Sequence, residues 1–194
     1  MSGLALKEWA VVVHALLAGE QILDLRKGGL REEERRFELR APRFWLYPTT
    51  EHQRPELVKP AYRRWLDAPE PGDRLRIAGW ADVAGVATVT DEAVLDGLES
   101  KVVWTREYVE SRLQFKARQP LWVMVLRCHR LVEPVEVAMR DEYAGCASWV
   151  EVDGLPDDPA ALASEPALTD ESFTARMKLC ADGIPGGFAP PPSK

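Results

Sequence analysis

The chain has 194 residues, 46% of them hydrophobic, and a formal net charge of −6. This length suits one domain or two small associated ones. The longest apolar runs, 10–13 and 121–126, are much shorter than the ~20 residues that cross a membrane. The apolar stretch near the start also lacks the cleavage site of a signal peptide. We therefore expect a cytoplasmic α+β protein with no membrane contact.

The three cysteines indicate reduced thiols rather than a disulfide framework. Cys128, Cys146 and Cys180 are odd in number, widely spaced and outside any Cys-x-x-Cys pattern. The three histidines are also far apart in the sequence. We expect neither a metal site nor a cofactor.

Charge is distributed unevenly along the chain. Residues 101–130 contain seven basic and two acidic residues, whereas residues 131–194 contain four basic and twelve acidic ones. A basic face can bind nucleic acid even in an acidic protein, and an acidic tail can dock a protein partner. Ordinary solvated surfaces explain the same distribution equally well.

The first predicted element is a helix. Apolar residues recur at helical spacing over residues 9–17, and Gly19 favours the end of that helix. Strands and turns follow, with a glycine turn at 28–29. The strands expected in this part are 22–25, 37–39 and 44–47.

The middle of the chain alternates between helices and strands. Residues 55–66 are predicted to be helical, although Pro60 interrupts the pattern. Asp91 and Thr105 are typical N-cap residues and predict two helices, 91–99 and 105–115. The strands expected here are 74–77, 82–89, 121–131, 135–137 and 149–152.

Composition changes near residue 155, where prolines and acidic residues become frequent. We predict one α+β domain over 1–154 and a partly disordered acidic tail over 155–194, with one helix at 169–181. Within the domain, residues 1–35 would form a helix-strand extension that precedes the main fold of about 36–152.

No catalytic constellation is convincing. A nuclease of the restriction type needs a lysine two residues beyond an acid, but in Asp24-Leu25-Arg26-Lys27 it is three residues on, on the opposite side of a strand. The candidate nucleophiles are Cys146 and Ser148. Either His52 or His129 would have to approach them in space, and a buried structural cysteine is the commoner case. Catalytic residues stay unassigned, and the pattern favours a binding protein over an enzyme.

Two basic segments are candidates for phosphate contacts. Arg26-Lys27-Gly28-Gly29 lacks the spacing of a nucleotide-binding loop, but a basic pair beside a glycine turn can hold a nucleic-acid phosphate. A charged hairpin turn explains it equally well. On the helix that Thr105 begins, Tyr108, Arg112 and 115–116 share a face. Such side chains can stack on bases and neutralise phosphates, or the aromatic ones can pack inward.

The seven tryptophans exceed what a core of this size requires, and a pocket for a planar ligand needs aromatic walls. His52 follows a turn, where side chains are usually exposed, and is a further candidate for binding. The tryptophans next to polar turn residues are Trp45, Trp80, Trp104 and Trp149.

Five short motifs occur in the order found in a bacterial family known as a domain of unknown function, number 1802. They are Leu6-Lys7-Glu8-Trp9-Ala10, Arg26-Lys27-Gly28-Gly29, Phe44-Trp45-Leu46-Tyr47-Pro48-Thr49 with His52-Gln53, Trp104-Thr105 with Tyr108-Val109 and Arg112-Leu113, and Gly145-Cys146 with Ser148-Trp149. The resemblance covers about residues 4–152. It implies an association with restriction–modification systems, and therefore with nucleic acid.

The order of elements also resembles the PUA-like group of small β-barrels, which includes the EVE and ASCH domains. The similar features are the strand that ends in Leu46-Tyr47-Pro48-Thr49, the Pro71-Gly72-Asp73-Arg74-Leu75 segment, and the strands at 83–89 and 121–131. The insert at 91–119 departs from that pattern. The resemblance implies a small mixed or antiparallel β-barrel with flanking helices, whose pocket accepts a base.

These observations lead to a non-catalytic nucleic-acid-binding module that reads a modified or flipped base in a restriction, defence or RNA-processing setting. Arg26, Lys27, Arg112 and Lys116 would hold phosphates. His52, Gln53 and Ser148 would bind a base edge, and Trp45, Trp104 or Trp149 would stack on the base. One alternative is a nuclease or hydrolase that uses Glu8, His52 and Cys146. Another is a protein-interaction subunit that docks a partner through the acidic tail.

Overall fold

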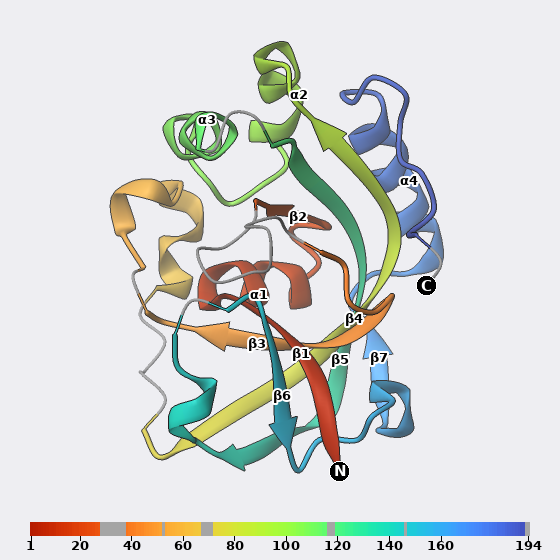
Figure 1. Cartoon of the computed structure of the whole chain (residues 1–194). Helices are drawn as coiled ribbons and strands as arrows, with labels where there is room; N and C mark the ends of the chain where they lie inside the picture. The colour runs from red at the N-terminus through yellow and green to blue at the C-terminus, as the bar shows by residue number, and fades with distance from the viewer. Residues whose placement is uncertain (28–37, 52, 67–71, 116–118, 146, 193–194) are drawn as a thin grey trace.

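The computed structural model describes residues 1–27, 38–51, 53–66, 72–115, 119–145 and 147–192 (Figure 1). Its centre is one seven-stranded sheet with the order β2-β5-β4-β3-β1-β6, and β7 pairs with β5. β1 and β3 run parallel, and the other neighbours run antiparallel. The strands are β1 (Ser2–Trp9), β2 (Leu23–Arg26), β3 (Arg43–Thr49), β4 (Arg74–Val89), β5 (Leu121–Ala138), β6 (Trp149–Asp153) and β7 (Ser164–Pro166).

The predicted α+β class, with a mixed sheet and flanking helices, is confirmed. The expected closure into a barrel is corrected, because the strand order runs openly from β2 to β6 and no pairing within the described ranges joins these two strands. A barrel would require hydrogen bonds between the first and last strands of the order. The sheet is strongly curved but open at this position (Figure 1).

The N-terminal strand β1 is the main element that the sequence pattern concealed. Residues 9–17 were expected to start the fold as a helix, and α1 (Ala10–Leu17) is present, but it follows a strand that lies inside the sheet. β1 pairs with β3 through Ala5 and Trp45, and with β6 through Leu4 and Glu151. Its apolar residues are covered on both faces, so they lack the alternation that marks a half-exposed strand.

Helix α1 is apolar on nearly all sides, which is typical of a buried helix. All of its residues except His14 are buried. Gly19 then adopts a φ of 69°, which glycine reaches without the strain of a Cβ. The chain turns there and enters β2.

Strands β4 and β5 are each longer than predicted. The segments expected at 74–77 and 82–89 form one strand, and so do those at 121–131 and 135–137. Their pairing contains register shifts at Ile77/Gly79 and Val83/Gly85. Such irregularities bend a strand without ending it, so the sequence pattern breaks where the hydrogen-bond ladder continues.

The segment expected as a helix at 55–66 consists of two 3₁₀ turns instead, Pro55–Leu57 and Pro60–Trp65. Between them Val58 forms an isolated β-bridge with Trp104. Pro60 lacks the N–H that a continuous α-helix would need, and the bridge draws the backbone towards Trp104. This bridge helps to position the tryptophan.

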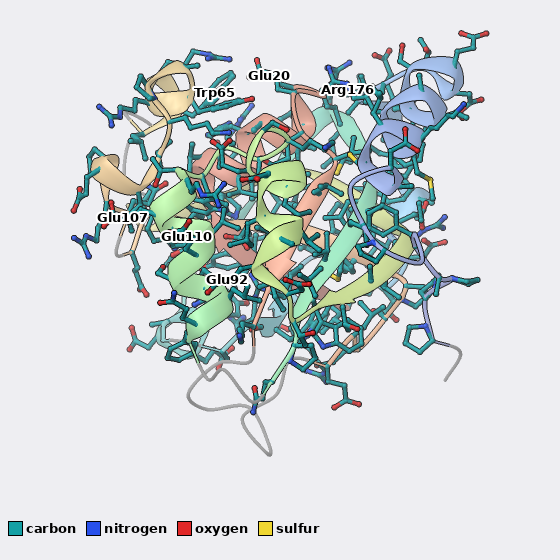
Figure 2. The ribbon with its side chains drawn as sticks, turned by 90° about the horizontal axis from the view of Figure 1, so that it is seen from above. Glu20, Trp65, Glu92, Glu107, Glu110 and Arg176 are labelled. Carbon is teal, nitrogen blue, oxygen red and sulfur yellow. The ribbon has the colours of Figure 1, made fainter. Side chains whose placement is uncertain are left out.

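The two predicted helices of the insert are confirmed as α2 (Leu95–Glu99), which a short 3₁₀ turn at Glu92–Val94 precedes, and α3 (Arg106–Gln114). The Thr105 side chain accepts a hydrogen bond from the Tyr108 N–H and caps α3. Seen from above, α2 and α3 lie side by side, and Glu107 lies on the outer side of α3 (Figure 2).

The C-terminal part packs against the long strands. Helix α4 (Asp170–Ala181) begins after Thr169, whose hydroxyl accepts the Ser172 N–H at 3.2 Å. β7 pairs with β5, and Ala189 bridges to Val86 of β4. The domain boundary at residue 154 stays a prediction. None of the helices in the described ranges has the length and apolar character needed to cross a membrane.

Candidate functional site

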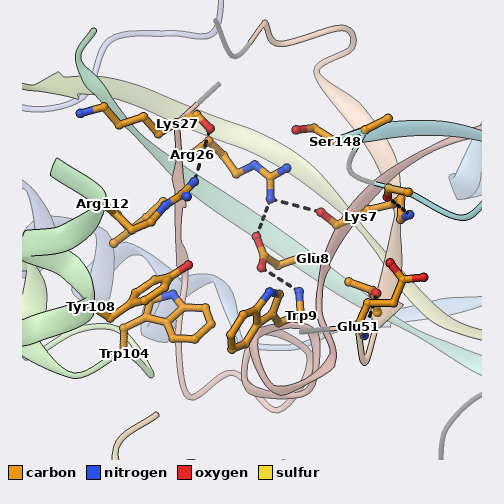
Figure 3. A pocket seen from close by; sticks show the side chains of 14 residues that line it. Lys7, Glu8, Trp9, Arg26, Lys27, Glu51, Trp104, Tyr108, Arg112 and Ser148 are labelled. Atoms are coloured by element: carbon orange, nitrogen blue, oxygen red, sulfur yellow. Dashed lines mark hydrogen bonds and ion pairs between the residues drawn. The ribbon is translucent and has the colours of Figure 1, made fainter. Parts of the chain in front are cut away.

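A pocket of about 300 Å³ opens between the end of β1, the end of β2, helix α3 and the segment that leads into β6 (Figure 3). Residues from β2 and from the approach to β6 lie on opposite sides of it, so the pocket occupies the position where the two edge strands do not pair. Its lining consists of Lys7, Glu8, Trp9, Leu25, Arg26, Lys27, Thr49, Glu51, Trp104, Tyr108, Arg112, Gly145, Ala147 and Ser148.

A buried ion pair lies in the pocket wall. Arg26 Nη1 is 2.6 Å from Glu8 Oε2, and the two side chains are only 12% and 9% exposed. The same Nη1 donates to the Lys7 carbonyl oxygen at 3.1 Å, and Glu8 Oε1 accepts the Trp9 N–H at 2.7 Å. These contacts hold both charged groups in fixed positions, as Figure 3 shows.

Asp24 lies behind this ion pair and is 2% exposed. Its Oδ2 atom is buried and has no fixed donor within the described part of the chain. Burial raises the pKa of Asp24 well above its usual range, the Glu8 charge raises it further, and the Arg26 charge opposes both effects. Asp24 and Arg26 are two residues apart on β2 and therefore share one side of the strand.

The other cationic groups are held by backbone carbonyls. Lys7 Nζ donates to the carbonyl oxygens of Tyr143 and Gly145 at 2.7 and 2.8 Å. Lys27 Nζ donates to the Leu113 carbonyl at the end of α3. Arg112 Nη2 donates to the Lys27 carbonyl at 3.3 Å.

Lys27 and Arg112 are therefore two neighbouring cations that no carboxylate neutralises among the residues that the structure describes. Burial lowers the pKa of Lys27, and the Arg112 charge lowers it further. The Nε atom of Arg112 is buried without a hydrogen-bond partner. Negative charge brought between these groups would relieve their repulsion.

Three aromatic rings form one wall. Trp104 and Tyr108 stack with ring centroids 4.1 Å apart, and Trp9 meets Trp104 edge-on at 4.9 Å. Trp104 is only 3% exposed, whereas Trp9 and Tyr108 are partly exposed. Burial raises the pKa of Tyr108 to about 12, so its hydroxyl keeps its proton at neutral pH.

Five of the residues predicted for binding lie on this pocket: Arg26, Lys27, Trp104, Arg112 and Ser148. The structure changes the roles of several of them. Arg26 already binds Glu8, the Lys27 ammonium points away from the pocket towards α3, and Tyr108 covers one face of Trp104 (Figure 3). The partly exposed aromatic surface belongs instead to Trp9 and Tyr108.

Three predicted residues lie elsewhere. Trp45 is 0% exposed and donates to the Pro156 carbonyl at 2.9 Å, and Trp149 packs edge-on against Phe44. Neither has a ring face that a base can reach, so the predicted stacking role is wrong for both. Gln53 Oε1 accepts the Val11 N–H at 3.3 Å, beside the first turn of α1.

His52 and Lys116 lie outside the described residues, as does Cys146. The convergence of Glu8, His52 and Cys146 that a hydrolase would need is therefore an untested prediction. Glu8 does lie on the pocket, and Gly145 and Ala147 on either side of Cys146 line it too. No group of three potential metal ligands occurs within the ranges that the structure describes.

Sequence reasoning missed Lys7 and Trp9, and it considered Glu8 only for catalysis. The available signal was two adjacent charges, Lys7 and Glu8, inside an otherwise apolar run that ends at Leu17. Charged residues in such a run are rarely buried without a partner. The pair therefore indicated a polar site before any strand was assigned.

A family model described as "Domain of unknown function (DUF1802)" matches residues 5–178 of the chain. No curated protein sequence matches it. Among solved structures, the chain is similar to ASCH from Zymomonas mobilis, with 14% identity and a TM-score of 0.44 over 78% of this chain and 88% of that one. Two mutant proteins of that ASCH give 12% and 14% identity and TM-scores of 0.44 and 0.43, over 79% and 91% of this chain and 92% and 95% of theirs.

Proposed function

We propose that this chain, which belongs to the family described as a domain of unknown function (DUF1802), binds one nucleotide of a nucleic acid in the pocket beside α3. The observation that carries the proposal is the pair of neighbouring cations, Lys27 and Arg112, without a carboxylate partner in the described chain. They lie at a pocket that also has partly exposed aromatic rings.

The charge arrangement supports an anionic ligand. Two cations at short range in a poorly hydrated site repel each other, and the lowered pKa of Lys27 expresses that repulsion. A phosphate near the Arg112 guanidinium would provide the missing negative charge and a planar set of acceptors. Arg112 therefore replaces Arg26 and Lys27 as the main candidate for a direct phosphate contact.

The aromatic wall supports a planar group attached to that anion. Trp9 and Tyr108 keep some exposed surface, and a base stacked on an aromatic ring gains about 1–3 kcal/mol. Ser148 and Thr49 place hydroxyl groups on the same pocket. Hydroxyl groups can donate to or accept from a base edge, so they suit recognition of a nucleotide.

Pocket size limits the form of the nucleic acid. About 300 Å³ is at the small end of ligand sites and accommodates a single nucleotide rather than a duplex. The ligand would therefore be single-stranded, or a base extruded from a duplex. Whether that base is modified, and whether the setting is restriction, defence or RNA processing, are finer predictions that the proposal does not require.

The test is a titration of fluorescently labelled single-stranded DNA and RNA oligonucleotides, with fully paired duplexes for comparison. We expect binding of single strands at low salt and weaker binding of duplexes. Arg112→Gln should reduce affinity and lower the slope of log K against log[salt] by about one. Lys178→Gln removes a cation from the exposed face of α4 and is the matched control.

Two results would overturn the proposal. One is the absence of detectable binding to any single strand at low salt. The other is an equal loss of affinity in Arg112→Gln and Lys178→Gln, because binding would then follow the overall charge and not this pocket. Circular dichroism of both variants would show that they are folded.

A further inference from the structure

Arg26 has a counter-anion within the protein. Glu8 Oε2 lies 2.6 Å from its guanidinium, and both side chains are nearly inaccessible to water. Charge pairs this short and this buried are strong, so Arg26 is neutralised before any ligand arrives. A ligand phosphate could bind Arg26 only by competing with Glu8.

The two carboxyl groups Glu8 and Asp24 form a pair that holds one proton. Asp24 is hydrogen-bonded to Glu8 through its side chain. Two ionised carboxylates have no hydrogen to share, so one of them must be protonated for this bond to exist. Asp24 is the more buried partner, and its Oδ2 has no other donor in the described chain. The proton therefore resides on Asp24, and Arg26 keeps Glu8 ionised.

The groups around this pair do not compete for protons near neutral pH. Arg26 from β2 and Arg112 from α3 remain cationic. Burial raises the pKa of Tyr108 from α3 to about 12 and raises the pKa of Cys128 from β5, so both stay protonated. Glu8 is consequently the acceptor for any additional proton at this position.

We propose that Glu8 occupies Arg26 until a ligand phosphate replaces it, and that the Glu8–Asp24 pair takes up one proton from solution as the phosphate binds. This inference rests on the proposed nucleotide binding. The phosphate removes the cationic partner that keeps Glu8 ionised and places a second negative charge nearby. Both changes favour protonation of Glu8, whose new O–H can donate to the bound phosphate.

The proton balance can be measured directly. An oligonucleotide without terminal phosphates is suitable, because its phosphodiesters do not titrate near neutral pH. Calorimetric titrations in two buffers with different ionisation enthalpies give the number of protons taken up. We expect this number to approach one and the affinity to fall by up to about tenfold for each unit of pH increase.

Glu8→Gln removes the competing anion and the titrating group but keeps the shape of the side chain. We expect it to bind the oligonucleotide more tightly than the wild type and without proton uptake. Glu107→Gln, on the outer side of α3 (Figure 2), is the matched control and should keep the uptake. His52→Gln should keep it too, which separates the carboxyl pair from a titrating histidine.

The outcomes distinguish this inference from the proposed function. No binding at any pH would remove the proposed function itself. Binding without proton uptake, or uptake that Glu8→Gln leaves unchanged, would overturn the exchange at Arg26 and leave nucleotide binding intact. The measurement on the wild-type protein is decisive even if a variant fails to fold.

Discussion

The side-chain oxygen of Gln21 accepts a hydrogen bond from the backbone N–H of Val103 at 2.8 Å. The Gln21 amide also donates to the Leu23 carbonyl at 2.6 Å, and the residue is only 2% exposed. One buried amide therefore joins the turn before β2 to the segment that carries Trp104. Two walls of the pocket are held at a fixed separation by this contact.

Gln21→Leu should destabilise the protein by about 1–3 kcal/mol, because it leaves the Val103 N–H and the Leu23 carbonyl buried without partners. Urea unfolding followed by tryptophan fluorescence would measure the loss. The exposed Gln114→Leu is the control and should change stability by less than about 0.5 kcal/mol. Equal stability of the two variants would contradict the role given to Gln21.

Tyr108 should contribute to ligand binding mainly through its ring. Tyr108→Ala removes the partly exposed face beside Trp9 and should lower oligonucleotide affinity by about 1–3 kcal/mol. Tyr108→Phe keeps the ring and should lose less, since only the hydroxyl is removed. Anisotropy titrations of both variants would decide this, and an equal loss in the two would assign the effect to the hydroxyl.

Stability should depend on pH through Asp24. Its pKa is raised in the folded protein, chiefly by burial, so the folded state binds this proton more tightly than the unfolded state. The resulting stabilisation is complete below the unfolded pKa and is lost as pH rises through the folded pKa. Asp24→Asn should remove this loss and raise the melting temperature at neutral pH relative to the wild type.

Thermal melts of the wild type and Asp24→Asn across a pH series provide the measurement. Asp157→Asn, in an exposed loop, is the control and should follow the wild-type profile. A wild-type melting temperature that rises with pH as steeply as that of Asp24→Asn would show that Asp24 is ionised throughout.

Gly79 should tolerate no side chain. A Cβ there would overlap the His129 carbonyl oxygen and the side chain of Leu17, at one of the register shifts between β4 and β5. Gly79→Ala should therefore cost about 1–3 kcal/mol or more, because the backbone of β5 has to move. Gly72→Ala meets no atom within 4 Å and should be neutral. Denaturant midpoints of the two variants would show the contrast.

Local signals in the sequence predicted the helices well. Thr105 and Thr169 cap α3 and α4 with side-chain hydrogen bonds, and the apolar periodicity before Gly19 marks α1. Such features depend on neighbouring residues only. The location of β1 depends instead on its pairing with β3 and β6, which no local pattern reveals.

Burial separated tryptophans that look alike in sequence. Trp45 and Trp104 both neighbour polar turn residues, but Trp45 packs over Gly3, where a Cβ would lie 2.5 Å from its Nε1. The missing side chain lets Trp45 sink into the core, whereas Trp104 packs between Trp9 and Tyr108 at the pocket. Arg26, Lys27 and Arg112 were predictable from charge, but their hydrogen-bond partners were not, because those lie far away in sequence.

The place of β1 between β3 and β6 has a consequence for biosynthesis. The first strand to leave the ribosome acquires its antiparallel partner only when residues near Asp153 have emerged, and the Gly154 N–H then bonds to the Met1 carbonyl at 3.0 Å. Until then Ala5 and Leu6 belong to an uncovered strand edge, which invites pairing with other nascent chains. The pocket assembles late for the same reason, so we expect chaperone capture during translation to protect this protein from aggregation.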